Sequence, residues 1–169
     1  MSFTTVKLQL GHLLRQLGGC QRALDLHQEA LDISLERAPF LLQPVESQLA
    51  MDWFALGDPE KGKQYFENAN RRKKMGSIGS GFCLPYLAMA KVAWAQYFGD
   101  WEEALSTLNT AATEAAQRKL ILHELLLQYE TIRALTAMDA VGEAKKLKIA
   151  LMDRADKKEI KFFDRSNSI

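Results

Sequence analysis

Residues that build tight turns and cross-links are scarce in this sequence. It has 10 glycines and 4 prolines among 169 residues, too few for an all-β fold with many tight turns. Its two cysteines, Cys20 and Cys83, form neither a CxxC motif nor a disulfide framework. Free thiols are the rule in reducing compartments, so we expect both to stay reduced in a cytoplasmic protein.

Strong net charge and long apolar runs are missing as well. The formal net charge is +1, which leaves no overall field to hold nucleic acid or an anionic membrane. The richest apolar stretch, residues 120–127, carries His123 and Glu124 and is far shorter than the roughly 18 residues of a membrane span. The first ten residues have one lysine and no apolar core, unlike a secretory signal. These absences predict a protein that contacts neither nucleic acid nor membrane directly.

Helical periodicity is what the sequence does have. Apolar residues recur at the spacing i, i+3, i+4 and i+7, as in Leu10, Leu13, Leu14 and Leu17. No strand-like alternation of apolar and polar residues is sustained anywhere in the sequence. The pattern predicts seven or eight helices in antiparallel pairs, over residues 3–17, 20–37, 43–56, 59–75, 84–98, 101–118, 121–138 and 141–157.

Two kinds of residue recur with one period. The breaks inside the predicted pairs fall at Gly18, Gly57, Gly99 and Asp139, which are 39, 42 and 40 residues apart. The small residues one turn into each second helix keep the same steps: Ala23, Gly62, Ala104 and Ala144. Glycine ends a helix in the left-handed conformation, and small residues fit where two helices cross closely. Two independent marks in one register indicate a stacked repeat.

These marks resemble those of the tetratricopeptide repeat (TPR), whose units carry small residues at fixed positions of both helices. The packing positions that match this pattern are Gly11, Gly18, Ala23, Ala30, Ala50, Gly57, Gly62, Ala69, Gly99, Ala104, Ala111 and Ala144. The period near 40 exceeds the usual period of about 34 residues and is similar to that of long-repeat, MalT-like proteins. The resemblance implies an all-α fold, a right-handed superhelix of antiparallel helix hairpins (an α-solenoid) with about 3.5–4 repeats.

In that interpretation residues 1–169 form a single TPR-like domain. Its repeats cover residues 4–42, 43–82, 84–120 and 121–157, and residues 158–169 form a tail. His27 departs from the pattern, which has a large apolar residue there, and Val92 and Ala95 reverse its small-then-large order. The first helix begins at once, without a polar capping helix. We therefore expect either a piece of a longer array or a homo-oligomer formed through an exposed repeat end.

The resemblance also implies a concave groove lined by the first helix of each pair. The groove positions are Leu8, His12, Arg15, Gln16, Ser47, Met51, Phe54, Tyr86, Met89, Gln96, Tyr97, Tyr129 and Arg133. This mixture of aromatic residues, Met and Arg suits an apolar or aromatic peptide anchored by one or two anionic groups. The apolar members could equally pack between neighbouring helices. The polar members expected to be exposed are His12, Arg15, Gln96 and Arg133.

Other candidate sites have structural explanations. The basic run at residues 71–74 ends a predicted helix, where cations complement the helix dipole, although an anionic partner would also suit it. The glycine-rich segment 76–81 lacks P-loop spacing and is predicted to be a linker. The three histidines show no metal-binding spacing and are expected to be structural, and Cys20 is expected to pack.

No catalytic constellation, metal set or dinucleotide loop stands in the sequence, so we expect neither an enzyme nor a cofactor. The pattern favours a protein–protein interaction scaffold that binds an unidentified peptide or partner protein in its groove. The alternative is an effector-sensing or oligomerisation segment of a larger MalT-like (LuxR-type) transcriptional regulator. In that case the DNA-binding part would lie outside these residues.

Overall fold

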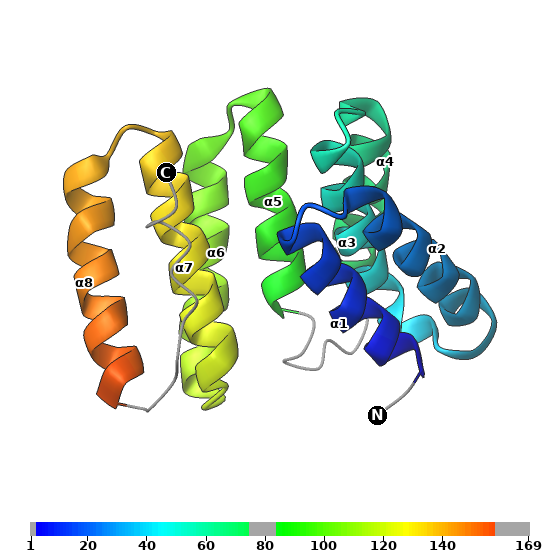
Figure 1. Cartoon of the computed structure of the whole chain (residues 1–169), viewed down its shortest axis with the longest axis horizontal. Coiled ribbons are helices and arrows are strands. Elements are labelled where there is room, and N and C mark those ends of the chain that lie inside the picture. Colours follow the sequence, from blue (N-terminus) through cyan, green and yellow to red (C-terminus); the bar gives the residue numbers. More distant parts are fainter. Residues whose placement is uncertain (1–2, 75–83, 158–169) are drawn as a thin grey trace.

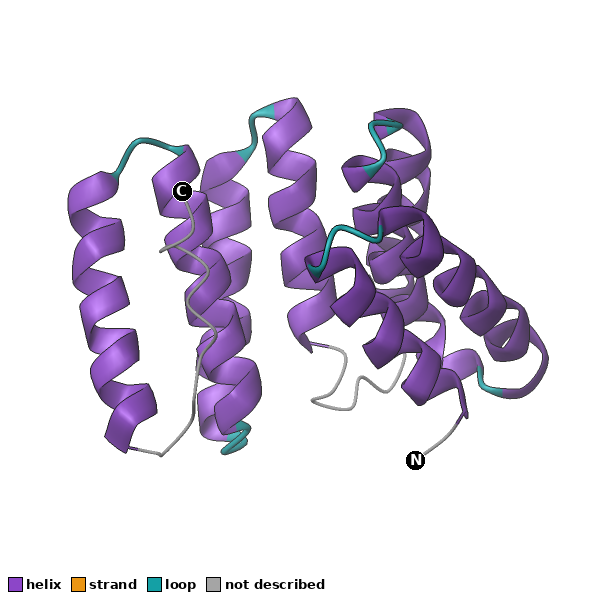
Figure 2. Cartoon of the chain, in the orientation of Figure 1, coloured by secondary structure: helices purple, strands orange, loops and turns teal. Residues whose placement is uncertain are grey.

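The computed structural model describes residues 3–74 and 84–157, and helices account for nearly all of them (Figures 1 and 2). The α-helices are α1 (Phe3–Gln16), α2 (Cys20–Arg37), α3 (Leu42–Ala55), α4 (Pro59–Lys74), α5 (Leu84–Phe98), α6 (Trp101–Gln117), α7 (Ile121–Ala137) and α8 (Val141–Lys157). A short 3-10 turn, η1 (Pro39–Leu41), leads into α3, and neither described range contains a strand. The predicted all-α class is confirmed, and every predicted helix is present with bounds within one residue.

Each helix packs against its neighbour in the chain, from α1 on α2 to α7 on α8. The first helices of the four hairpins also meet one another, because α1 contacts α3, α3 contacts α5, and α5 contacts α7. Figure 1 shows α1 to α4 grouped at one end of the long axis and α5 to α8 at the other. The first helices therefore share one face of the molecule, which is where the candidate site lies.

The turns inside the hairpins adopt the left-handed conformation at the periodic positions. The backbone φ is +85° at Gly18, +80° at Gly57, +78° at Gly99 and +61° at Asp139. After three of these residues, the next N–H closes the helix end with a hydrogen bond of 2.8–2.9 Å to the carbonyl five residues back. The predicted helix ends at all four positions are confirmed. Lys119, between α6 and α7, is a fifth residue with positive φ and was not predicted.

Small residues lie where helices approach most closely. Ala23, Ala30, Ala50, Ala69 and Ala104 are fully buried, and Ala111 and Ala144 are nearly so. A Cβ added at Gly62 would lie 2.7 Å from the Phe54 ring, and one added at Gly11 would lie 2.4 Å from Nε2 of His27. These two approaches need glycine, because no neighbouring atom can come so near a Cβ.

Three apolar clusters run along the stack. One joins α1, α2 and α3 around Leu8 and Leu49, the next joins α3, α4 and α5 around Phe54 and Phe66, and the last joins α5, α6 and α7 around Leu108. Each cluster spans a hairpin and the helix that follows it. Apolar burial therefore joins the two helices of a hairpin and also joins that hairpin to the next one. None of the helices in the described ranges is long and apolar enough to cross a bilayer.

Candidate partner-binding pocket

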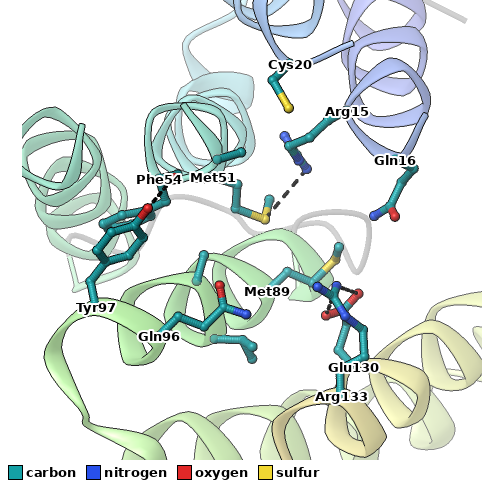
Figure 3. Close-up of a pocket in the computed structure, with 13 residues that line it drawn as sticks. Arg15, Gln16, Cys20, Met51, Phe54, Met89, Gln96, Tyr97, Glu130 and Arg133 are labelled. Atoms are coloured by element: carbon teal, nitrogen blue, oxygen red, sulfur yellow. Dashed lines mark hydrogen bonds and ion pairs between the residues drawn. The ribbon is translucent and has the colours of Figure 1, made fainter. Parts of the chain in front are cut away.

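A cavity of about 400 Å³ opens on the face that the first helices share (Figure 3). Its lining residues are Arg15, Gln16, Cys20, Met51, Phe54, Ala55, Met89, Val92, Ala93, Gln96, Tyr97, Glu130 and Arg133. All of them belong to α1, α3, α5 or α7 except Cys20, which starts α2. The pocket therefore depends on how successive hairpins are placed, and no hairpin forms it alone.

The floor of the pocket is apolar and well packed. Met51, Phe54, Met89 and Val92 are each at most 6% exposed. The Tyr97 ring stacks on Phe54 with a centroid separation of 5.3 Å, and its hydroxyl donates to the Phe54 carbonyl oxygen at 2.5 Å. Met51, Phe54 and Met89 thus pack between neighbouring helices, as one of the two interpretations predicted, and also present a surface to the cavity.

Arg15 extends from α1 to the pocket, but its guanidinium forms its hydrogen bonds with side chains in the protein interior. Its Nη1 donates to Oδ1 of Asp52 at 2.6 Å, and its Nη2 donates to Oε1 of Gln48 at 2.5 Å. Asp52 is fully buried and its other oxygen lies 2.5 Å from Nδ1 of His27. Only 9% of the Arg15 side chain is exposed. The prediction that Arg15 is exposed is wrong, because a buried carboxylate holds its charge inside.

His12 is tied to the same group and lies outside the pocket lining. Its Nδ1 is 3.1 Å from Nη2 of Arg15, which can only donate, so this nitrogen accepts and the ring is neutral. Burial, and after it the charge of Arg15, lower the pKa of His12 from 6.5 to about 4. Its ring meets Tyr86 edge to face at 6.5 Å. His12 is thus partly buried and not the exposed specificity residue that was expected.

Arg133 carries the accessible positive charge of the pocket. Its Nη1 donates to both oxygens of Glu130, at 3.1 and 3.0 Å, and 47% of its side chain is exposed. Glu130 is only 2% exposed, and burial raises the pKa of its carboxyl although Arg133 and Arg15 act against that rise. Figure 3 shows Arg133 and Glu130 together on the side of the pocket opposite Met51. An anionic group on a ligand would meet Arg133 first.

Eight of the thirteen predicted groove residues line the cavity, and the five that do not are Leu8, His12, Ser47, Tyr86 and Tyr129. Tyr86 is buried and accepts a hydrogen bond from Gln9 at 2.8 Å, whereas Tyr129 is exposed. The lining residues that were missed are Cys20, Ala55, Val92, Ala93 and Glu130. Helical spacing could have found Glu130, which stands three residues before Arg133. Ala55 and Cys20 carried no signal, since nothing distinguishes a small residue beside a pocket from one in a helix contact.

Two of the remaining candidates, Arg72 and His27, have partners inside the protein. Arg72, in the basic run 71–74, forms two hydrogen bonds to the Glu46 carboxylate, at 2.6 and 2.9 Å. His27 is fully buried, as predicted, and burial lowers the pKa of the half-buried His123. No group of three His, Cys, Asp or Glu side chains within residues 3–74 and 84–157 could hold a metal ion. Segment 76–81 and Cys83 lie outside the described residues.

No family model, curated protein or solved structure matches the chain. What the chain does must therefore be inferred from the chemistry of the pocket and from the helices that form it.

Proposed function

We propose that the chain is a TPR-like interaction scaffold in which the four hairpins follow one another as a right-handed α-solenoid. The equivalence of the hairpins supports this proposal. Left-handed turns recur 39, 42 and 40 residues apart at positions 18, 57, 99 and 139. A buried small residue follows one turn into each second helix, at positions 23, 62, 104 and 144. Repetition of both features favours one structural unit used four times.

The observation that carries the proposed function is the cavity lined by all four first helices. A volume of about 400 Å³ lies within the range of small-ligand sites, roughly 300–1,000 Å³. It accommodates a few peptide side chains rather than a whole domain. We therefore propose that the partner inserts a short segment into this pocket.

The lining defines the chemistry of that segment. The buried floor of Met51, Phe54 and Met89 is suited to a large apolar or aromatic side chain. The exposed rim residues Gln96 and Arg133 offer donors for the backbone and for an anionic group of the partner. An apolar anchor with a carboxylate close to it is the segment that this surface favours.

The test compares peptide binding by the wild-type chain and by a variant in which side chains added at the rim fill the pocket. Peptides are first selected against the wild-type chain from a random-sequence display library. Their dissociation constants are then measured for an Ala55→Trp, Gln96→Trp variant, whose two added rings are expected to occupy the cavity. Both residues are exposed, so the variant should fold. We expect binding to weaken by at least about tenfold, because the apolar anchor loses its site.

An Ala116→Trp variant provides the matched control, since Ala116 is exposed on α6 and does not line the pocket. Its affinity for the same peptides should equal that of the wild type. Arg133→Ala should weaken only peptides that contain an acidic residue. Arg15 is unsuitable for such a test, because Arg15→Glu would set a carboxylate beside buried Asp52. Peptides that bind the filled variant as tightly as the wild type would refute the proposed site.

A further inference from the structure

The outer face of α1 carries a continuous row of exposed apolar side chains. Phe3 is 69% exposed, Val6 41%, Leu10 45% and Leu13 54%, and Leu17, just beyond the helix, is 58% exposed. At 3.6 residues per turn these five positions fall within an arc of about 80°. We call this row the α1 seam. The buried residues of α1, among them Leu8 and Gly11, lie on a different side of the helix.

The α1 seam has the spacing of a helix-pairing surface. Its steps of three, four, three and four residues are those of apolar positions a and d in a heptad repeat. An isolated exposed leucine is ordinary on a protein surface, but a row with this period is what a second helix packs against. The spacing therefore indicates that an α-helix, rather than an extended strand or a small molecule, covers the seam.

None of the side chains that form the α1 seam is charged. The exposed residues of α1 other than the seam are Gln9 and Gln16. The charged side chains of the helix are largely covered and paired: Lys7 is 13% exposed and pairs with Glu29, and Arg15 pairs with Asp52. The Lys7 ammonium lies 4.7 Å from the centroid of the Phe3 ring, at the N-terminal end of the seam. The helix at the other end of the stack, α8, differs. It exposes Glu143, Lys145 and Lys146 beside its apolar residues.

We propose that the α1 seam is the interface of a homodimer, in which α1 of one copy packs against α1 of a second copy across a twofold axis. A twofold interface brings the same patch of both copies together, so that residue i of one copy contacts residue j of the other and j contacts i; a patch with charge of one sign would therefore repel its copy. The seam contains no charged residue. A charged partner helix would leave its charges unpaired against it, whereas a second copy is complementary to it.

The size of the seam agrees with a dimer of modest affinity. At roughly 200 Å² of surface for each large apolar side chain, the exposed fractions leave about 500 Å² on each copy. A symmetric pair would bury about 1,000 Å² through these residues alone, which is the lower limit for a specific interface.

The test measures the oligomeric state of the full chain by sedimentation equilibrium, from about 1 to about 200 µM. We expect the wild type to dimerise within this range. Leu10→Glu with Leu13→Glu places four carboxylates at the centre of the symmetric pair and should weaken dimerisation by roughly 100-fold or more. The matched control is Leu122→Glu with Ile149→Glu, at positions 67% and 62% exposed on α7 and α8, and it should dimerise like the wild type.

A mixing experiment separates loss of the interface from loss of folding. A second variant carries Leu10→Lys and Leu13→Lys, and circular dichroism should show the helical content of the wild type in both variants. Each variant alone should be monomeric, and an equal mixture should form a mixed dimer because glutamate then meets lysine. A wild-type chain that stays monomeric throughout the range, or a glutamate variant that dimerises like the wild type, overturns the proposal.

Discussion

The junction between the first two hairpins and the junction between the last two are built by different chemistry. In the first, Asp52 of α3 is held from the preceding hairpin by Arg15 at 2.6 Å and by His27 at 2.5 Å. In the last, the buried cluster consists only of alanine, valine and leucine. Its buried acids, Glu124 and Glu130, pair with Arg154 and Arg133 of their own hairpin. Charge thus crosses the first junction and stays within the hairpin at the last.

This difference predicts different responses to substitution. An apolar junction tolerates changes of shape at a cost that follows the volume lost. A buried ion group loses far more when one member is removed, because the others remain buried without a partner. It also restricts the approach of the two hairpins, since hydrogen bonds require particular distances and directions. The first junction is therefore expected to be the more specific and the more fragile of the two.

Asp52→Ala should have the largest effect. Arg15 and His27 would keep their buried positions without a carboxylate, and the free energy of unfolding should fall by about 3–5 kcal/mol. Urea denaturation followed by circular dichroism measures this change. Asp25→Ala, at an exposed position on α2, is the control and should cost less than about 0.5 kcal/mol.

A double-mutant cycle of Asp52→Ala and His27→Ala sharpens this result. The double variant should lose less stability than the sum of the two single variants, because each single change leaves the other partner unpaired. Additive losses would show that the two side chains are not coupled across the junction, and would remove the contrast with the last junction.

Gly11→Ala should have the next largest effect. The added Cβ would lie 2.4 Å from Nε2 of His27 and must displace a fully buried ring, so we expect a loss of about 3 kcal/mol. Gly142→Ala in α8 is the matched control, because nothing lies within 4 Å of its added Cβ. That change should raise stability by about 0.5–1 kcal/mol through helix propensity. Equal effects at the two positions would contradict the close approach of α1 to α2.

The smallest effect should be a dependence on pH. Because the pKa of His12 is about 4 in the folded chain and 6.5 as its ordinary value, the unfolded chain binds more protons between these values. Stability should therefore fall as the pH is lowered from about 6.5 towards 4. His12→Asn keeps a hydrogen-bond acceptor for Arg15 but cannot titrate. Between pH 7 and 4.5 the free energy of unfolding of this variant should fall by about 2 kcal/mol less than that of the wild type.

Thermal denaturation of both chains across this range measures the difference. Carboxyl groups titrate in both chains alike, so only the divergence of the two profiles reports on His12. Parallel profiles would mean that His12 is solvated in the folded chain and does not belong to the buried group.

Local pattern was sufficient to predict the helices and their ends. Apolar spacing placed every helix to within one residue, and the period predicted the helix break at Asp139, where the residue is not glycine. Both signals are local, because a helix and its end depend on residues within about one turn. The same spacing found most of the pocket floor, since residues on one helix face recur every three or four positions.

The roles of the polar residues were not predictable in this way. His27 reads as a misfit in the repeat pattern, and Asp52 carried no signal at all. In the folded chain they form one group with Arg15, although they are 25 and 37 residues apart in the sequence. The sequence predicts an exposed Arg15, because an arginine on a first helix usually reaches solvent. Only the partner across the junction shows that it does not.

By itself the sequence determined the class of the fold, the bounds of its helices and the register of its turns, because these depend on nearest neighbours along the chain. The tertiary structure decided which charges are buried, which of the two pocket arginines is accessible, and that the apolar side chains of the α1 seam are exposed. Those properties depend on which helices meet in space, and burial decides whether a charge needs a partner.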